Sequence, residues 1–388
     1  MSATGHVLLA PDKFKGSLSA GQVAAHLRNG LLRTCATLDV ATVPVADGGD
    51  GTLEAAEFAG FTRRTVEVAG PTGDPVQAAF VVRADTAVVE LSEASGLRRL
   101  PGGRHDPMHA SSRGTGELVR AALDAGATRV VIGLGGSACT DGGAGLVQAL
   151  GARLLDRSGA ELAPGGAALI RLHRLDVSDL DPRLAHTQVV IASDVDNPLL
   201  GPRGAAAVYG PQKGATPDDV ARLESALAHW AATVTATLGR SVVAHPGAGA
   251  AGGVGFAALA LLDATLVPGI DMLLELVGFE RARAGARLVI TGEGRLDEQT
   301  LSGKAPAGVA AAATRAGVPV VAVAGASMLD RAQTSAAGIS AVYTLAALEP
   351  DPARCLAEAG DLLERLGAQI AKDLLAARPV TREREVEV

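Results

Sequence analysis

The 388-residue chain has few aromatic residues and few cysteines. Aromatic residues make up 2% of it, so aliphatic side chains and glycine must fill the core, which suits helices packed closely on a parallel sheet. The three cysteines, Cys35, Cys139 and Cys355, show no metal-ligand spacing and cannot all pair with one another. This usage is typical of a reducing compartment. We therefore expect a cytoplasmic protein.

The sequence also lacks the signals of secretion, membrane insertion and nucleic-acid binding. The N-terminus has no basic start followed by an apolar core and a cleavage site. The longest apolar stretch, residues 254–267, contains Asp263 and stops at Pro268, so it is too short to cross a bilayer. The net charge is −7, and no basic run occurs, which argues against nucleic acid as a partner. The sequence does not specify the oligomeric state.

Lysine is scarce, since only five of the 35 basic Lys and Arg residues are lysine. Four of the five lie in segments marked by Gly or Pro: Lys13, Lys15, Lys213 and Lys304. The lysine ammonium is a compact donor that suits phosphate. We interpret these four as candidate contacts to an anionic ligand, with ordinary surface placement as the alternative. Lys213 is expected in a flexible loop that could act as a lid.

Short apolar runs alternate with longer Ala- and Leu-rich stretches, which is typical of an α/β fold. Residues 61–103 differ, because short strands there are joined by turns. We therefore predict two unlike α/β domains with a cleft between them. One is a doubly wound Rossmann- or flavodoxin-like parallel sheet built from residues 1–60 and 286–388. The other is an inserted mixed-sheet domain, residues 61–285.

The same patterns predict individual elements. The predicted strands are residues 6–10, 42–46, 65–69, 76–82, 87–91, 130–134, 189–192, 288–291, 318–324 and 341–345. The predicted helices are residues 19–33, with Ser17 or Ser19 as the N-cap, and residues 54–59, 113–125, 143–155, 217–238 and 256–265. The charged tail, residues 379–388, is expected to fray.

Several predicted strands run into polar loops, the first two of which lie near the N-terminus. The segment APDKFKGS carries Lys13, Lys15 and Ser17 between a strand and a helix, where ligands meet the carboxyl edge of a sheet. The segment DGGDGT carries Asp47 and Asp50, which could hold Mg²⁺ or orient a hydroxyl group. The alternatives are a capping turn for the first segment and an ordinary Gly/Asp turn for the second.

Two further loops follow central strands. In IGLGGSACTDGGAG, the backbone around Gly135, Gly136 and Ser137 could form an anion cradle, although the string is not a Walker A motif. A tight turn is the alternative. In SDVDNP, Asp194 and Asp196 offer oxygen ligands that suit Mg²⁺, with an Asx-turn as the alternative.

The last polar segment, TGEGRLDEQTLSGKAP, has the highest density of charge. After a short apolar strand come Glu293, Arg295, Asp297, Ser302 and Lys304. Opposite charges in a Gly-rich loop suit phosphoryl transfer, since a carboxylate can hold a metal and a cation can stabilise the transferred group. The alternative is a solvated loop with surface ion pairs.

A competing motif occurs in HPGAGAAGGVGFAA. Gly247, Gly249 and Gly252 match G-x-G-x-x-G, the pattern of a dinucleotide-binding turn. This motif favours an NAD-dependent hydroxy-acid dehydrogenase, but only if residues 241–244 form the preceding strand. Close packing at the start of a helix explains the same glycines. A non-catalytic sensor of a small acid is a third possibility.

The polar strings together resemble the type I glycerate kinase family. They are APDKFKGSLSA, PVADGGDGT, GPTGDPV, SSRGTGEL, GLGGSACTDGG, SDVDNPLLGP, PQKGA and TGEGRLDEQTLSGKAP, in that order from about residue 9 to residue 325. The resemblance implies phosphorylation of D-glycerate by ATP with Mg²⁺, with 2-phosphoglycerate as the favoured product.

Residue type and loop position then suggest roles within such a reaction. Mg²⁺ is assigned to carboxylates among Asp194, Asp196 and Glu293. The ATP site is assigned to Gly135, Gly136, Ser137, Glu293, Arg295, Asp297 and Lys304. The substrate carboxylate is assigned to Lys13, Lys15, Ser17 or Arg113. Catalysis is assigned to Asp47, Asp50, Asp194 and Lys304, with Asp47 or Asp50 orienting or deprotonating the attacking hydroxyl.

Overall fold

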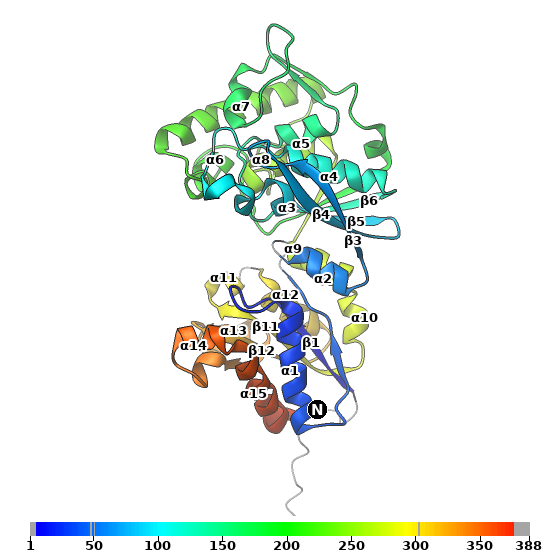
Figure 1. Cartoon of the computed structure of the whole chain (residues 1–388), viewed down its shortest axis with the longest axis vertical. Coiled ribbons are helices and arrows are strands. Elements are labelled where there is room, and N and C mark those ends of the chain that lie inside the picture. The colour runs from blue at the N-terminus through cyan, green and yellow to red at the C-terminus, as the bar shows by residue number, and fades with distance from the viewer. Residues whose placement is uncertain (1–4, 47–48, 50, 302, 376–388) are drawn as a thin grey trace, which may run out of the picture. The chain divides into compact units, whose positions relative to one another are not determined.

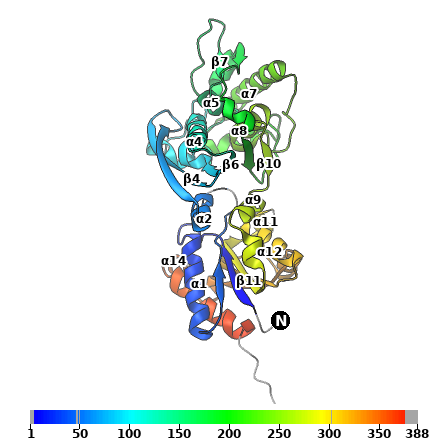
Figure 2. The same ribbon diagram turned by 90° about the vertical axis from the view of Figure 1, so that its right-hand side faces the viewer.

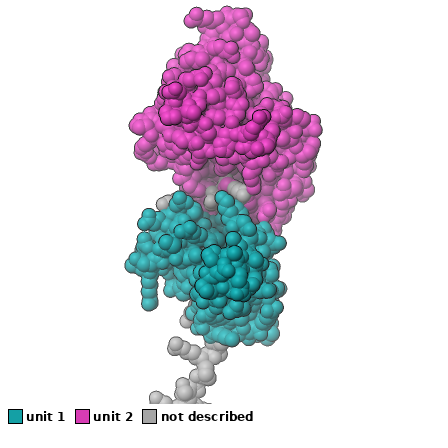
Figure 3. All heavy atoms as spheres, turned by 60° about the vertical axis from the view of Figure 1, so that its left-hand side comes forward, with its two compact units in different colours: residues 1–44, 279–388 teal, residues 45–278 magenta. Residues whose placement is uncertain are grey.

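The structure is a computed structural model that describes residues 5–46, 49, 51–301 and 303–375. The chain forms two compact units, coloured separately in Figure 3. Unit 1 comes from residues 1–44 and 279–388, so both ends of the chain contribute to it. Unit 2 comes from residues 45–278.

Unit 1 is built on a five-stranded sheet in which every neighbouring pair of strands is parallel. The spatial order is β13-β12-β11-β1-β2. Read in the other direction and in chain order within the unit, this is the flavodoxin-like order 2-1-3-4-5. The strands are β1 (His6–Pro11), β2 (Val40–Thr42), β11 (Ala286–Leu296), β12 (Val320–Ser327) and β13 (Ile339–Thr344).

Helices complete unit 1, and two of them, α1 and α15, lie side by side (Figure 1). Helix α1 starts where the sequence predicts, because the Ser19 side chain accepts from Gln22 N–H and the Gln22 side chain returns a bond to the Ser19 backbone. The helices are α1 (Ala20–Thr34), α10 (Phe279–Arg283), α11 (Glu298–Leu301), α12 (Ala305–Arg315), α13 (Arg331–Ala336), α14 (Pro352–Ala357) and α15 (Ala359–Ile370).

Unit 2 is built on a mixed six-stranded sheet of order β10-β9-β6-β5-β4-β3. Strands β3, β4 and β5 pair antiparallel, whereas β5, β6, β9 and β10 pair parallel. Strands β7 and β8 form a separate antiparallel pair. The strands are β3 (Thr62–Ala69), β4 (Pro75–Arg83), β5 (Thr86–Glu90), β6 (Arg129–Gly133), β7 (Arg153–Leu155), β8 (Arg174–Asp176), β9 (Gln188–Ala192) and β10 (Thr265–Val267).

The helices of unit 2 enclose its largest hydrophobic core. Trp230 of α7 and Phe256 of α8 meet edge to face in this core, where α7 and α8 are neighbours (Figure 2). The Trp230 indole donates to Gly142 O, so the ring is both buried and hydrogen-bonded. The helices are α2 (Thr52–Phe58), α3 (Leu91–Ser95), α4 (Arg113–Asp124), α5 (Ala144–Ala149), α6 (Ala205–Tyr209), α7 (Pro217–Leu238), α8 (Ala250–Leu261) and α9 (Gly269–Leu276).

These architectures confirm the predicted fold class, because one sheet is parallel with flavodoxin-like order and the other is mixed. Some predicted elements are wrong. The strand predicted at residues 42–46 ends at Thr42, and the helix predicted at residues 256–265 starts at Ala250 and gives way to β10. The tail predicted to fray lies outside the described residues.

The helix predicted at residues 143–155 is also wrong at its end. Helix α5 stops at Ala149, and Arg153–Leu155 is a strand. The physical reason lies at Gly151, which has φ +109°, a conformation that other residues rarely adopt. A Cβ there would lie 2.0 Å from Asp179 O. The chain must therefore turn at this glycine.

Within the described part of the chain, no helix combines the length and the hydrophobicity needed to cross a membrane.

Candidate functional site

In unit 1, polar residues gather where β1 and β11 end. These neighbouring strands form the switch point of a 2-1-3-4-5 sheet, the place at which ligands bind in such folds. The Asp12 N–H donates to Gly292 O over 2.8 Å, and the Thr291 hydroxyl donates to Ala10 O over 2.8 Å. These bonds fasten the end of β1, and the loop after it that carries Lys13, to β11.

One residue of β11 and three residues that follow it form what we call the β11 cluster: Glu293, Asp297, Thr300 and Lys304. The buried Thr300 hydroxyl donates to Glu293 Oε1 over 2.6 Å and accepts from the Asp297 N–H over 3.0 Å. Lys304 Nζ lies 3.9 Å from Glu293 Oε2 and 3.7 Å from Asp297 Oδ1. Thr300 therefore fixes both carboxylate-bearing segments, and the ammonium lies close to both carboxylates.

The β11 cluster leaves its cation accessible. The Lys304 side chain is 30% exposed, whereas the Glu293 side chain is 12% exposed. Lys304 also occupies the N-cap position of α12, where its extended backbone leads into Pro306 in the first turn. An ammonium held this way can pair with an anionic oxygen of a ligand without leaving the carboxylates.

The substrate residues predicted near the N-terminus occupy the same unit. Lys15 is exposed and Lys13 is half-buried, and the backbone of Lys15 passes close to Gly294, where an added Cβ would lie 3.3 Å from Lys15 N. Ser17 instead donates to Leu356 O over 3.2 Å. The structure thus brings the lysine loop beside β11, on which the exposed Arg295 also lies.

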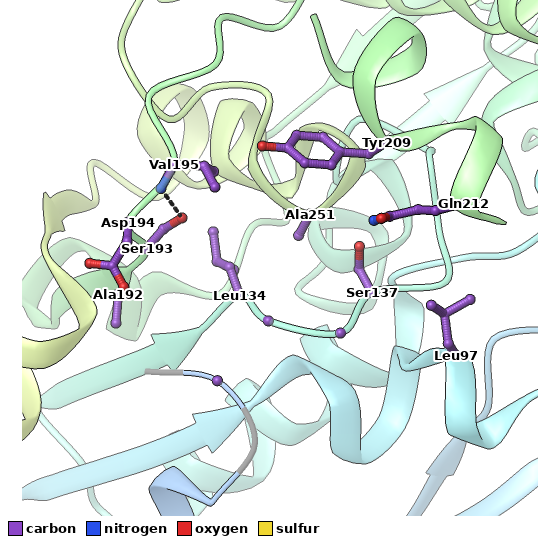
Figure 4. Close-up of a pocket in the computed structure, with 13 residues that line it drawn as sticks. Leu97, Leu134, Ser137, Ala192, Ser193, Asp194, Val195, Tyr209, Gln212 and Ala251 are labelled. Atoms are coloured by element: carbon purple, nitrogen blue, oxygen red, sulfur yellow. Dashed lines mark hydrogen bonds between the residues drawn. The ribbon is translucent and has the colours of Figure 1, made fainter. Parts of the chain in front are cut away.

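Unit 2 has a hollow of about 290 Å³ at the carboxyl ends of β6 and β9 (Figure 4). Three of the predicted loops share it, although they are far apart in sequence. They contribute Gly49 of DGGDGT, the run from Leu134 to Ser137, and Ala192 to Val195. Leu97, Tyr209, Gln212 and Ala251 complete its lining.

The Gly-rich loop of this hollow presents unsatisfied donors. Gly136 has φ +71°, and the chain turns so that Gly136 O accepts from Leu97 N–H and Ala138 N–H donates to Ser95 O. Among the described residues, the N–H groups of Gly135, Gly136 and Ser137 have no hydrogen-bond acceptor. Successive free amides of this kind attract anions, and the anion cradle at these residues stays a prediction.

The two aspartates of SDVDNP differ in their contacts. Asp194 lines the hollow, and its Oδ1 accepts from the Gly269 N–H over 2.9 Å. The Asp196 side chain is 73% exposed, and both of its carboxylate oxygens accept from Arg203 Nη2, at 2.9 and 3.0 Å. Asn197 accepts from the Tyr209 hydroxyl over 2.5 Å. Burial of Tyr209, together with the Asp196 charge, raises the pKa of this phenol, which stays neutral.

The predicted metal ligands do not form a preassembled cluster in the described residues, where no group of three His, Cys, Asp or Glu side chains could hold an ion. Asp194 and Asp196 belong to unit 2, and Glu293 belongs to unit 1. Mg²⁺ commonly binds through one or two carboxylates and completes its shell with phosphate oxygens and waters. Asp194 and Glu293 each suit that mode of binding.

Arg113, proposed as a substrate contact, belongs to unit 2 at the first position of α4. Its Nε donates to Glu117 Oε1 over 3.1 Å, one turn further along the helix. Asp47, Asp50 and Ser302 lie outside the described residues. In the described part of the DGGDGT segment, the Thr52 hydroxyl donates to Gly49 O over 2.8 Å.

Lys213 is not the lid contact that its sequence context suggested. Its side chain is 1% exposed, and Nζ donates to Cys139 O over 2.5 Å. Desolvation lowers the pKa of Lys213. The loop that carries it places Gln212 in the hollow instead. The prediction failed because sequence shows that a lysine follows a turn but not which way the turn directs it.

Buried carboxylates that the sequence did not single out support the hollow. Asp141 is fully buried, and its carboxylate accepts from the N–H and the hydroxyl of Ser112. It also accepts from the N–H groups of Gly143 and Gly145. Glu90, at the end of β5, accepts from Leu53 N–H over 2.8 Å. Glu90 was detectable only as an acidic residue at the end of a predicted strand.

The G-x-G-x-x-G string has no dinucleotide-binding geometry. Residues 241–249 contain no strand, so the preceding strand that the dinucleotide-binding interpretation required at 241–244 is absent. A Cβ on Gly249 would lie 2.3 Å from Pro198 O, and one on Gly252 would lie 2.1 Å from Cys139 O. These glycines serve close packing of backbone on backbone, the alternative that the sequence left open.

Free amides and a lysine held near carboxylates follow the carboxyl ends of parallel strands, an arrangement that suits an α/β enzyme with an anionic ligand. Residues 7–375 match the model of the glycerate kinase family, and the chain belongs to that family. The protein is accordingly a kinase.

Individual relatives agree with this assignment. A glycerate kinase of Bacillus subtilis is 46% identical over 376 residues, which are 96% of this chain and 98% of the relative. A glycerate 2-kinase of Escherichia coli is 44% identical over 342 residues, 87% of this chain and 90% of the relative. A crystal structure from Salmonella typhimurium LT2, described as a candidate glycerate kinase 2, superimposes with a TM-score of 0.85 at 42% identity and covers 95% of this chain and 98% of that one.

Proposed function

We propose that the protein transfers the γ-phosphoryl group of MgATP to a hydroxyl of D-glycerate, with 2-phosphoglycerate as the favoured product. The hydroxyl oxygen forms the new P–O bond, the bond to the ADP oxygen breaks, and a carboxylate takes the hydroxyl proton. Family membership and the names of the relatives support the substrate. The name of the Escherichia coli relative supports the 2-position.

The observation that carries this proposal is the position of Lys304 in the β11 cluster. Phosphoryl transfer needs a fixed cation for the charge on the transferred group, and little covalent chemistry from the protein. Lys304 Nζ is 3.9 Å from Glu293 and 3.7 Å from Asp297 and is still partly exposed. The carboxylates hold the ammonium in place at a switch point, where ligands of such sheets bind.

The other roles follow from the contacts of each residue. Lys13 and Lys15 are the cations nearest in sequence to the end of β1, and we assign them to the glycerate carboxylate. Arg113 is a weaker candidate because it already pairs with Glu117. Mg²⁺ bound with ATP would supply charge neutralisation on the phosphates, and Asp194 in unit 2 and Glu293 in unit 1 are separate candidates for a carboxylate that would hold it. Asp47 and Asp50 stay proposals for the base.

The test is a coupled assay of ADP release with D-glycerate and other small hydroxy-acids. We expect ADP and phosphoglycerate in equal amounts, only when Mg²⁺ is present, and NMR of the product should place phosphate on carbon 2. Lys304→Met should lower kcat about 100-fold or more, as loss of a fixed donor to the developing charge does elsewhere.

The chain offers a matched control in Lys372, an exposed lysine in the turn that follows α15. Lys372→Met should leave kcat unchanged. Full activity of Lys304→Met would remove the role of the β11 cluster. Glycerate binding without ADP release would instead indicate the non-catalytic sensor.

A further inference from the structure

The described lining of the hollow of unit 2 is largely apolar and has no cationic side chain, which is unusual for a site that binds a small carboxylic acid. Its apolar side chains are Leu97, Leu134, Ala192, Val195 and Ala251, with the Tyr209 ring beside them. The described lining contains no Lys, Arg or His, and Asp194 is its one charged side chain. An anion that filled this hollow would meet free backbone amides on one side only, and apolar walls and a carboxylate elsewhere.

Glycerate is a poor match for such walls. It has three carbons, two hydroxyls and a carboxylate, so nearly all of its surface is polar, and burying it there without a cation would be costly. A heteroaromatic base is a good match, because it is neutral and offers two flat faces to apolar side chains. The walls therefore favour a base.

The free amides lie in the same lining. Gly135, Gly136 and Ser137 border the hollow, and their N–H groups have no acceptor among the described residues. A base alone would leave these donors unsatisfied, and a free phosphate would leave the apolar walls empty. A nucleotide, in which base and phosphate are joined, satisfies both.

Two polar side chains can recognise the base. The Tyr209 ring is held by the bond from its hydroxyl to Asn197, and the Gln212 side chain extends into the hollow (Figure 4). Within the described residues, the Gln212 amide has no hydrogen-bond partner. A glutamine amide donates and accepts at once, which is the pair of bonds that the amino edge of adenine offers.

We propose that this hollow binds the nucleoside of the phosphate donor, with a phosphate on the amides of residues 135–137 and the adenine edge on Gln212. The assignment rests on the proposed kinase function for the identity of the ligand. It makes unit 2 the nucleotide-binding unit and Gln212 a determinant of base specificity.

Filling the hollow tests the location. Val195→Trp places a large ring in it, and Val208→Trp is the matched control, since Val208 is 42% exposed on α6 and does not line the hollow. Calorimetry with ADP and kinetics with ATP and D-glycerate should show that Val195→Trp raises Kd for ADP and KM for ATP tenfold or more. The KM for glycerate should change less than threefold, and the control should match the wild type.

Exchanging the recognition group tests specificity and covers the case in which Val195→Trp fails to fold. Gln212 is exposed, so Gln212→Ala should fold normally. The preference for ATP over GTP, as a ratio of kcat/KM, should fall about tenfold, the discrimination typical of one bidentate amide contact.

Three results would overturn the proposal: ADP affinity unchanged in Val195→Trp, a rise confined to the KM for glycerate, or an ATP-to-GTP ratio unaltered in Gln212→Ala. Wild-type protein that binds ADP but phosphorylates no hydroxy-acid would leave the hollow as a nucleotide site and reject the proposed kinase function alone. Wild-type protein that binds no ADP would reject the hollow.

Discussion

At the scale of single residues, two buried polar side chains, Lys213 and Asp141, fasten the segment from Cys139 to Asp141 to its surroundings. Lys213 donates to the carbonyl of Cys139, and Asp141 gathers N–H and hydroxyl donors from Ser112, Gly143 and Gly145. This segment continues directly from the amides that line the hollow of unit 2. Both charges are therefore expected to hold the loop in shape.

The first prediction concerns Lys213 and pH. Burial lowers the pKa of the folded-state amine below the value of 10.5 that the unfolded chain has. Between these two pKa values the unfolded state binds more protons, so the free energy of unfolding contributed by Lys213 rises with pH. Urea denaturation from pH 7 to 10 should show a less positive slope for Lys213→Met than for the wild type. Equal slopes would contradict the shift.

The second prediction concerns Asp141. Asp141→Asn replaces one carboxylate oxygen by an NH2 group, which donates and cannot accept. Buried N–H and hydroxyl donors then lose their acceptor. The free energy of unfolding should therefore fall by about 2–4 kcal/mol. Asp156 provides a control at the surface, where its carboxylate accepts from Ser158 and Ala160. Asp156→Asn should cost clearly less, and chemical denaturation measures both. Similar losses would show that burial of Asp141 is not decisive.

The sequence singled out candidate site residues where residue type alone constrains the chemistry. Lys304, Glu293 and Asp297 were singled out because a buried strand precedes them, and the structure brings them within about 4 Å of one another through Lys304. Tyr209 and Gln212 were missed, because no motif marks them and only tertiary packing turns them toward the hollow. The roles of all these residues, and the predicted cleft between the domains, stay predictions.

At the scale of elements, the crossing of α1 and α15 depends on close contact. A Cβ on Gly30 of α1 would lie 2.0 Å from Glu364 O of α15. Around this contact, the Glu364 carboxylate accepts from His26 and Asn29 and pairs with Arg33. These partners lower the pKa of Glu364, even though its burial opposes the shift. The helices therefore approach each other closely at Gly30, beside one acidic residue that pairs with three side chains of α1.

The third prediction tests this crossing. Gly30→Ala must force the helices apart, and the free energy of unfolding should fall by about 2 kcal/mol or more. Gly21→Ala, on the same helix, is the control, because its nearest neighbour is Ser19 Oγ at 3.9 Å. That change should stabilise by up to about 1 kcal/mol, since alanine has the higher helix propensity. Two variants of equal stability in thermal or urea denaturation would disprove the close contact.

The elements that the sequence predicted best are those whose signals are local. The predicted and observed bounds of α7 coincide at Pro217–Leu238, because a capping box at Thr216 and a glycine at residue 239 mark both ends. The β7–β8 pair was missed because residues 143–155 are rich in Ala and Leu, which favour a helix. The glycine that ends α5 is required by contact with Asp179, which local sequence does not reveal.

At the scale of the whole molecule, each unit has its own sheet and its own hydrophobic core. Every strand of unit 2 lies within residues 45–278, whereas unit 1 draws two strands from the start of the chain and three from its end. The predicted boundaries, after residues 60 and 285, stay a prediction. One continuous stretch of sequence therefore supplies every strand of unit 2, whereas unit 1 needs two separate stretches.

The fourth prediction follows from that continuity. A fragment of residues 45–278 keeps the six-stranded sheet and the core around Trp230, so it should fold alone and unfold cooperatively in urea. The complementary fragment, residues 279–388, retains three of the five strands of unit 1 and should not. Tryptophan fluorescence and circular dichroism measure the first, and circular dichroism the second. Loss of cooperativity in residues 45–278 would contradict the independence of this core.

The split origin of unit 1 bears on how the protein is made. During synthesis β1 and β2 leave the ribosome first. The strand that joins β1 to the rest of its sheet is β11, which is synthesised only after more than half of the chain. Until then one edge of β1, an apolar strand, has no native pairing partner. A nascent chain with such an exposed edge is a natural client for a ribosome-associated chaperone.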